Sequence, residues 1–319
     1  MTMTEESYRQ LTTRSGFVEC DTRTRLIIRG RDRLALLHNL CTNEVKKRQA
    51  GDVFETFFCD ARGKTIGFAS LMLFQDSVIL DSAPGQTERL MTHLDRYIIR
   101  EDVQLADMTA EYDQWLIAGP ESPQVIERMI GRAPESLAGE PTELAGQFLM
   151  IAPTHFLQDG GFWLFAARDT DEFIANSLTA AGALAIDANA IEVRRVETGT
   201  PEFGRDITSE NLPQEVGRDK QAISFVKGCY LGQETVARID ALGHVNRLLC
   251  GVKLAGETVA EPGTKLVYGD KEVGQITSSV FSPAIGAPLS LAYLRREHAT
   301  VGMLLTADGE SAEVVKLPV

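Results

Sequence analysis

The chain has 319 residues, of which 44% are hydrophobic and 24% are charged, and its formal net charge is −13. This composition is typical of a folded globular protein, because disordered chains carry fewer apolar residues and a membrane span needs a long apolar run. An acidic chain is also a poor match for phosphates, which bind to basic surfaces. We therefore expect no nucleic-acid partner and no membrane. The polar start MTMTEESYRQ carries no signal or transit pattern, which predicts a cytoplasmic protein.

The cysteines and histidines show no metal-ligand spacing. The five cysteines include no C-x-x-C pair, and the five histidines form no motif such as H-E-x-x-H. An odd number of thiols fits a reducing compartment better than a disulfide framework. We therefore predict no protein-bound metal. The cysteines are Cys20, Cys41, Cys59, Cys229 and Cys250.

The first third of the chain predicts helices packed on an antiparallel sheet. A helix within 31–45 has leucines at helical spacing and Asp32 in position to cap its start. A second amphipathic helix is marked by Leu90, Leu94 and Ile98. The expected strands are 25–30, 53–58, 65–74, 77–80 and 102–108, with a tight turn at 60–64.

The pattern then partly recurs and finally changes. Strands at 113–119 and 161–167 alternate with helices at 122–131 and 171–182, while 133–146 is expected to be a flexible connection. Beyond about Val245, short strands separated by glycine turns predict a small β-barrel, with Gly269 and Asp270 as a hairpin turn. The fold class is therefore α+β, with two α+β domains that have antiparallel, ferredoxin-like sheets, followed by the barrel. The predicted boundaries are 1–110, 111–243 and 244–319.

The stretch KGCYLGQE, residues 227–234, is the main candidate for chemistry. Lys227 close to Cys229 would favour the thiolate, and a helix beginning near Gln233 would add its N-terminal dipole. Gly228 and Gly232 predict a sharp turn or a close approach of another group. A lone cysteine is more often a buried apolar residue, and a pair between Glu234 and Arg238 explains both charges without a function.

A second polar stretch, residues 194–217, holds Glu197, Asp206 and Glu215 between glycines and prolines. Such a loop is suited to hold polar groups against a ligand. One carboxylate can accept two adjacent N–H donors, which is the arrangement at the edge of a pterin or a purine.

Together these segments resemble a known family. KGCYLGQE with the following VAR, Val236 to Arg238, looks like the signature of the YgfZ-type folate-binding proteins, which are related to the glycine-cleavage T-protein (aminomethyltransferase) and include iron-sulfur assembly homologues. Residues 30–45, 51–67, 194–207 and 274–295 resemble other segments of the same family, so the likeness runs from about residue 15 to the end.

The resemblance implies three domains around a central hole that binds tetrahydrofolate. It implies that Glu197 holds the pterin and that Arg218 contacts the same ligand, with Thr42 and Asn43 as lining residues. The motif residues it singles out, besides Lys227 and Cys229, are Gly228, Tyr230, Gly232, Gln233, Glu234 and Arg238. Cys41 and the turn residues Asp60, Arg62 and Lys64 are weaker candidates, for which a turn role is equally compatible.

This chain departs from the T-protein where that enzyme has an acidic run. Ile66 and Gly67 stand at the positions of the aspartate that acts beside the folate. A positioned acid or base is worth about 10² to 10⁴ in rate, so its absence disfavours aminomethyl transfer by that mechanism.

Three hypotheses follow. The leading one is a folate-binding accessory protein that supports assembly or repair of iron-sulfur clusters in client proteins, with Cys229 as its functional side chain. The second is a folate-dependent aminomethyl or methyl transferase of one-carbon metabolism. The third is a folate-binding or docking scaffold in which Cys229 is only packed.

Overall fold

The computed structural model describes residues 3–137, 139–158 and 160–319, and it divides into two compact units. Unit 1 comprises residues 1–58, 66–190 and 221–231, and unit 2 comprises 59–65, 191–220 and 232–319, apart from the undescribed residues. In the described part of the chain, no helix is long and apolar enough to cross a membrane.

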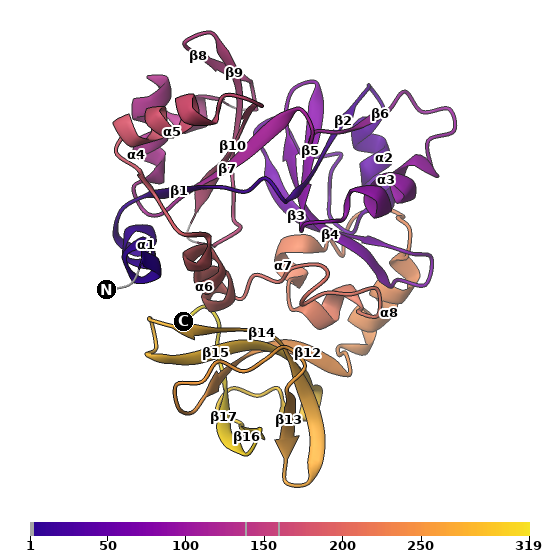
Figure 1. Cartoon of the computed structure of the whole chain (residues 1–319). Coiled ribbons are helices and arrows are strands. Elements are labelled where there is room, and N and C mark those ends of the chain that lie inside the picture. Colours follow the sequence, from indigo (N-terminus) through magenta and orange to yellow (C-terminus); the bar gives the residue numbers. More distant parts are fainter. Residues whose placement is uncertain (1–2, 138, 159) are drawn as a thin grey trace. The chain divides into compact units, whose positions relative to one another are not determined.

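The first sheet of unit 1 has the strand order β3-β4-β5-β2-β6 (Figure 1). The strand pairs β4–β5, β5–β2 and β2–β6 are antiparallel. Leu37, Leu40, Leu90 and Leu94 of its two helices are buried in one core with the inward side chains of the strands. The elements are β2 Thr24–Arg29, α2 Arg33–Leu40, β3 Val53–Cys59, β4 Thr65–Leu73, β5 Ser77–Ser82, α3 Thr87–Asp95 and β6 Gln104–Asp107.

Two details of this half differ from the sequence prediction. Asp32 stands at the N-cap position of α2, but its carboxylate makes no cap bond and instead accepts the N–H of Asp102 at 2.8 Å. The helix α3 ends at Asp95, so Ile98 lies beyond it, although Ile98 still packs against the same core.

The second sheet of unit 1 has the order β11-β1-β7-β10-β9-β8. Only the β1–β11 pair is parallel among its described pairs. Apolar residues of α4 and α5, such as Ile126 and Ile174, share its core. The elements are α1 Met3–Thr13, β1 Gly16–Glu19, β7 Tyr112–Ala118, α4 Ser122–Ile130, β8 Thr142–Leu144, β9 Gln147–Pro153, β10 Gly161–Ala167, α5 Asp171–Ala180 and β11 Leu184–Ala185.

The expectation of a flexible connection at 133–146 was wrong for its described residues. They form a 3-10 helix, Pro134–Leu137, and the edge strand β8, which pairs with β9. Leu137 is buried in the core, which explains why a segment rich in Pro, Gly and Glu is nevertheless ordered.

Unit 2 contains a closed barrel with the strand order β12-β15-β14-β13-β16-β17, drawn in orange to yellow in Figure 1. The predicted hairpin is confirmed, because Tyr268 pairs with Lys271 across Gly269 and Asp270. The barrel strands are β12 Arg247–Leu254, β13 Lys265–Tyr268, β14 Lys271–Ser282, β15 Ala287–Arg295, β16 Leu304–Ala307 and β17 Glu310–Val315. The helices outside the barrel are α6 Ala188–Thr198, which begins in unit 1, the 3-10 helix Pro213–Val216, α7 Asp219–Ala222, α8 Gln233–Leu242 and the 3-10 helix Arg296–His298.

The fold class is therefore confirmed as a mixture of helices and antiparallel sheets with a closed six-stranded barrel at the C-terminal end. The division at 110 and 243 stays a prediction.

Candidate functional site

Lys227 lies in the loop that carries Cys229, and it attaches this loop to the C-terminal end of helix α2. Its ammonium donates to the backbone carbonyls of His38, Cys41 and Asn43 at 2.6, 2.7 and 2.7 Å. These bonds use all three of its donors, and a cation suits the negative C-terminal end of a helix. Burial lowers the pKa of Lys227. These contacts show that Lys227 anchors the loop, and its predicted effect on the Cys229 thiolate stays a prediction.

The side chains of Thr42 and Asn43 bond to residues 222 and 221, at the start of the segment that leads to Cys229. The Thr42 hydroxyl donates to the carbonyl of Ala222 at 2.6 Å and accepts the N–H of Phe57. The Asn43 amide donates to the carbonyls of Glu55 and Gln221 at 2.8 and 2.7 Å. Both side chains are buried. Their polar groups are already bonded within unit 1, and the expectation that they line a folate cavity stays a prediction.

The tip of this loop is exposed between its anchors. Cys229 is solvent-exposed, and Val226 is 92% exposed. Tyr230 is buried, and the ammonium of Lys227 lies 4.7 Å from the centre of its ring. In the KGCY sequence, the buried residues Lys227 and Tyr230 therefore flank the exposed residues Gly228 and Cys229.

Cys229 is the exposed thiol among the five cysteines, all of which are described. Burial raises the pKa of Cys20 to about 12 and that of Cys250 to about 11. Burial also raises the pKa of Cys41, although nearby Lys227 opposes the effect. Because the thiolate is the reactive form, the raised pKa values disfavour chemistry at Cys20, Cys41 and Cys250.

The two glycines of the motif have different roles. Gly232 has a positive φ of 85°, and a Cβ there would lie 2.6 Å from the carbonyl oxygen of Asp60, so the predicted need for glycine is confirmed. At Gly228 a Cβ would meet nothing within 4 Å, and its φ is not positive. The predicted sharp turn or close approach of another group at Gly228 therefore has no support from its contacts and stays a prediction.

Helix α8 begins at Gln233, as the sequence predicted. Glu234 and Arg238 are both exposed, and the structure, which describes both side chains, shows no ion pair between them. The expected surface pair was therefore wrong. Gln233 is half-buried in the first turn.

Glu197, the predicted pterin ligand, is completely buried and internally bonded. One carboxylate oxygen pairs with Arg194 at 2.6 Å, and the other accepts the hydroxyl of Ser282 at 2.5 Å. Arg218 is also buried. As it stands, Glu197 has no oxygen reserved for a ligand, so its folate role stays a prediction.

The turn at 60–64 has the structural role that was the alternative to ligand binding. One carboxylate oxygen of Asp60 accepts the N–H groups of Arg62 and Lys64 at 2.9 and 2.8 Å. Beyond the turn, Gly67 packs so closely on Leu90 that a Cβ would lie 2.6 Å from it. An acidic side chain at 67 would therefore have to displace a core leucine.

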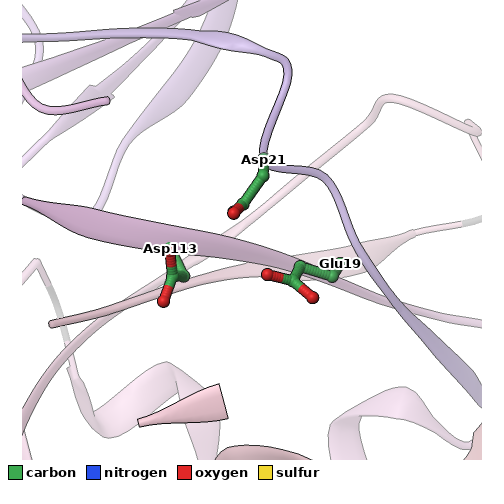
Figure 2. Close-up of side chains that lie close together, drawn as sticks. All are labelled: Glu19, Asp21 and Asp113. Atoms are coloured by element: carbon green, nitrogen blue, oxygen red, sulfur yellow. The ribbon is translucent and has the colours of Figure 1, made fainter. Parts of the chain in front are cut away.

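The structure also gathers three carboxylates that the sequence analysis missed. Glu19, Asp21 and Asp113 have oxygens within 4.8 Å of one another (Figure 2). Burial first, then Asp171 and Asp21, raise the pKa of Asp113 to about 7. Arg168 lies 3.6 Å from Asp113 and 3.8 Å from Asp21, so the cluster already has a cation of its own. Strand pairing of β1 with β7 creates this cluster, and no sequence spacing signals it.

Fold and sequence together define the class of protein. Residues 1–225 match the family model described as the GCVT N-terminal domain, and residues 247–319 match the glycine cleavage T-protein C-terminal barrel domain. The chain therefore belongs to the GCVT, or glycine-cleavage T-protein, family.

The chain is also similar to particular members of that family. The chain is 26% identical over 299 residues to a chloroplastic protein of Arabidopsis thaliana that carries the provisional name of a transferase, a match covering 91% of this chain and 68% of the relative. It is 26% identical over 322 residues to an aminomethyltransferase of Streptomyces avermitilis, covering 96% and 86%. The crystal structure of the glycine cleavage system aminomethyltransferase T from Bartonella henselae matches with a TM-score of 0.87 at 16% identity, covering 99% and 89% of the two chains, which shows the shared fold.

Proposed function

We propose that this chain is a tetrahydrofolate-binding accessory protein of the YgfZ type, which supports assembly or repair of iron-sulfur clusters in client enzymes. The observation that carries the proposal is the anchored loop that presents Cys229 to solvent while Lys227 and Tyr230 are buried. A fixed, exposed thiol is what reaction with a sulfur species or a disulfide requires. A single thiolate is a poor site for a stable cluster, so the client enzyme would be its final holder.

Tetrahydrofolate enters the proposal through family membership and the sequence resemblance. The contacts predicted for it do not all fit. The side chains of Thr42 and Asn43 already bond to the backbone carbonyls of Ala222 and Gln221, and their contact with folate stays a prediction. Each oxygen of the Glu197 carboxylate already accepts a side-chain hydrogen bond, from Arg194 or Ser282, and a ligand would use a remaining acceptor position. We derive no chemical step through folate.

The alternative is a folate-dependent aminomethyl or methyl transferase, which the names of several relatives favour. Against it stands the absence of an acidic residue at 66 and 67, where the T-protein places its aspartate. The third hypothesis, a scaffold with a packed Cys229, conflicts with the exposure of that residue.

The experiment compares Cys229→Ser with Cys20→Ser, a matched loss of a half-buried thiol, in cells that lack the wild-type protein. We expect Cys229→Ser to lower the activities of iron-sulfur enzymes, while Cys20→Ser leaves them near wild type. Normal activities with Cys229→Ser would overturn the proposal. Folate-dependent turnover of an aminomethyl donor that survives Cys229→Ser would support the transferase instead.

A further inference from the structure

A cavity of about 240 Å³ lies at the C-terminal end of helix α8, within unit 2. Its polar walls are formed by Gln214, Asp219, Asp240 and His244. Its apolar walls are formed by Ile239, Val245 and Leu248. We call this cavity, which Gly243 and Arg296 also line, the α8-end pocket.

Two acceptor oxygens of the α8-end pocket have no donor. Gln214 is 5% exposed, and its amide nitrogen donates to the carbonyl of Val236 at 2.7 Å. Its oxygen Oε1 is buried and has no hydrogen-bond partner in the structure, and the same is true of Oδ1 of Asp219. Because the large majority of buried polar atoms are bonded, two orphaned acceptors in one cavity indicate a missing donor.

The charges of the α8-end pocket also favour a donor that is positively charged. Burial and the neighbouring carboxylate of Asp240 raise the pKa of Asp219 to about 6, so Asp219 is largely ionised at neutral pH. Nδ1 of His244 lies 2.9 Å from the carbonyl of Leu242, which can only accept, so that nitrogen carries the proton.

Arg296 is the cation that lines the cavity beside these groups. It is exposed, and no ion pair or hydrogen bond of its side chain appears in the described part of the chain. Its guanidinium would repel a cationic ligand, and this gives the test a predicted sign.

The shape of the cavity selects the kind of cation. Among the described His, Cys, Asp and Glu side chains, three ligand atoms within 4.8 Å of one another occur at Glu19, Asp21 and Asp113, so Asp219, Asp240 and His244 do not form such a group. A volume of 240 Å³ corresponds to roughly eight waters. The apolar walls suit a methylene chain, and an ammonium group has three donors and no acceptor.

We propose that the α8-end pocket binds a primary alkylammonium group, carried by a small diamine or by a lysine side chain of a partner protein. Gln214, Asp219 and Asp240 would accept its three N–H groups, and the apolar walls would contact its chain. The inference does not depend on the proposed function, because it involves neither Cys229 nor folate.

The test is calorimetric titration of the full chain with 1,5-diaminopentane and, separately, with Nα-acetyl-lysine methylamide. We expect at least one probe to bind with a Kd of about 1 mM or tighter. Tighter binding of the lysine derivative would point to a partner protein, and tighter binding of the diamine to a free amine. 1,5-Pentanediol, which has the same chain without charge, should not bind.

Matched variants separate this site from general attraction to an acidic protein. Asp219→Asn and Asp240→Asn should each weaken binding by about tenfold or more, whereas Glu257→Gln, an equal loss of charge outside the pocket, should not. Arg296→Ala should tighten binding. Lowering the pH through about 6 should weaken binding by the wild type, because protonation removes the charge of Asp219.

Several results would overturn the proposal. The first is that neither probe binds at a probe concentration about tenfold above the expected Kd. The second is that 1,5-pentanediol binds as tightly as the diamine. The third is that Asp219→Asn and Glu257→Gln weaken binding equally. Weaker binding of the amine probes by Arg296→Ala would contradict the predicted repulsion between the Arg296 guanidinium and a cationic ligand. Thermal unfolding of each variant checks that it is folded.

Discussion

Replacing Lys227 with methionine tests whether this residue anchors the Cys229 loop. Methionine keeps much of the apolar stem but removes the three donors to the carbonyls of His38, Cys41 and Asn43. Leaving a buried acceptor without its donor costs about 1 kcal/mol or more. The methionine variant no longer has to bury an ammonium, and this gain offsets part of the total cost for the three acceptors. We therefore expect a loss of about 2–3 kcal/mol in the free energy of unfolding of unit 1.

The assay is thermal unfolding of Lys227→Met beside Lys46→Met, which changes an exposed lysine of the same unit. A loss of this size corresponds to a fall of about 4–12 °C in Tm for a unit of this length, while Lys46→Met should stay within about 0.5 kcal/mol of wild type. Limited proteolysis should also cut faster within residues 221–231 of the Lys227 variant. Equal Tm values and equal cleavage for the two variants would refute the anchoring role.

Three further predictions follow from the same contacts. Gly232→Ala should destabilise unit 2 by about 2 kcal/mol or more in urea unfolding, because its Cβ would meet the Asp60 carbonyl, while Gly228→Ala should be near neutral; equal effects would contradict this. Asp113→Asn should raise the free energy of unfolding by about 1–2 kcal/mol near pH 8 and change it little near pH 4. Because the pKa of Asp113 is raised from 3.8 to about 7, the folded state holds a proton that the unfolded state has lost, and wild-type stability falls as the pH rises from about 4 to about 7. An effect of Asp113→Asn that does not depend on pH would contradict this prediction. Native alkylation followed by mass spectrometry should label Cys229 first, and faster labelling of Cys20 or Cys250 would contradict the burial that raises their pKa values.

The fold was largely predictable because most of its elements carry local signals. Alternating apolar residues marked the strands, leucines at helical spacing marked α2 and α3, and Gly269 marked the barrel hairpin. The segment 133–146 was mispredicted because its composition resembles a loop, whereas the burial of Leu137 and pairing with β9 order it. Tertiary contacts of that kind have no local sequence signature.

The candidate site was predictable as a motif but not as a geometry. The sequence singled out Cys229 as the candidate functional thiol, with burial as the alternative, and the structure shows that this thiol is exposed. It also predicted the need for glycine at 232, which the structure confirms. It placed Lys227 at the thiol, because sequence neighbours suggest contact, whereas the carbonyls at the end of α2 compete more strongly for an ammonium. Thr42 and Asn43 were polar for an internal reason, namely to hold residues 221 and 222.

The most direct test of the proposed function is calorimetric titration of the wild type and of Cys229→Ser with tetrahydrofolate. We predict that both proteins bind one equivalent with similar affinity, because the thiol belongs to a step separate from folate binding. Absence of binding by both proteins would contradict the folate half of the proposal. Loss of binding by Cys229→Ser alone would contradict the separation of the two roles.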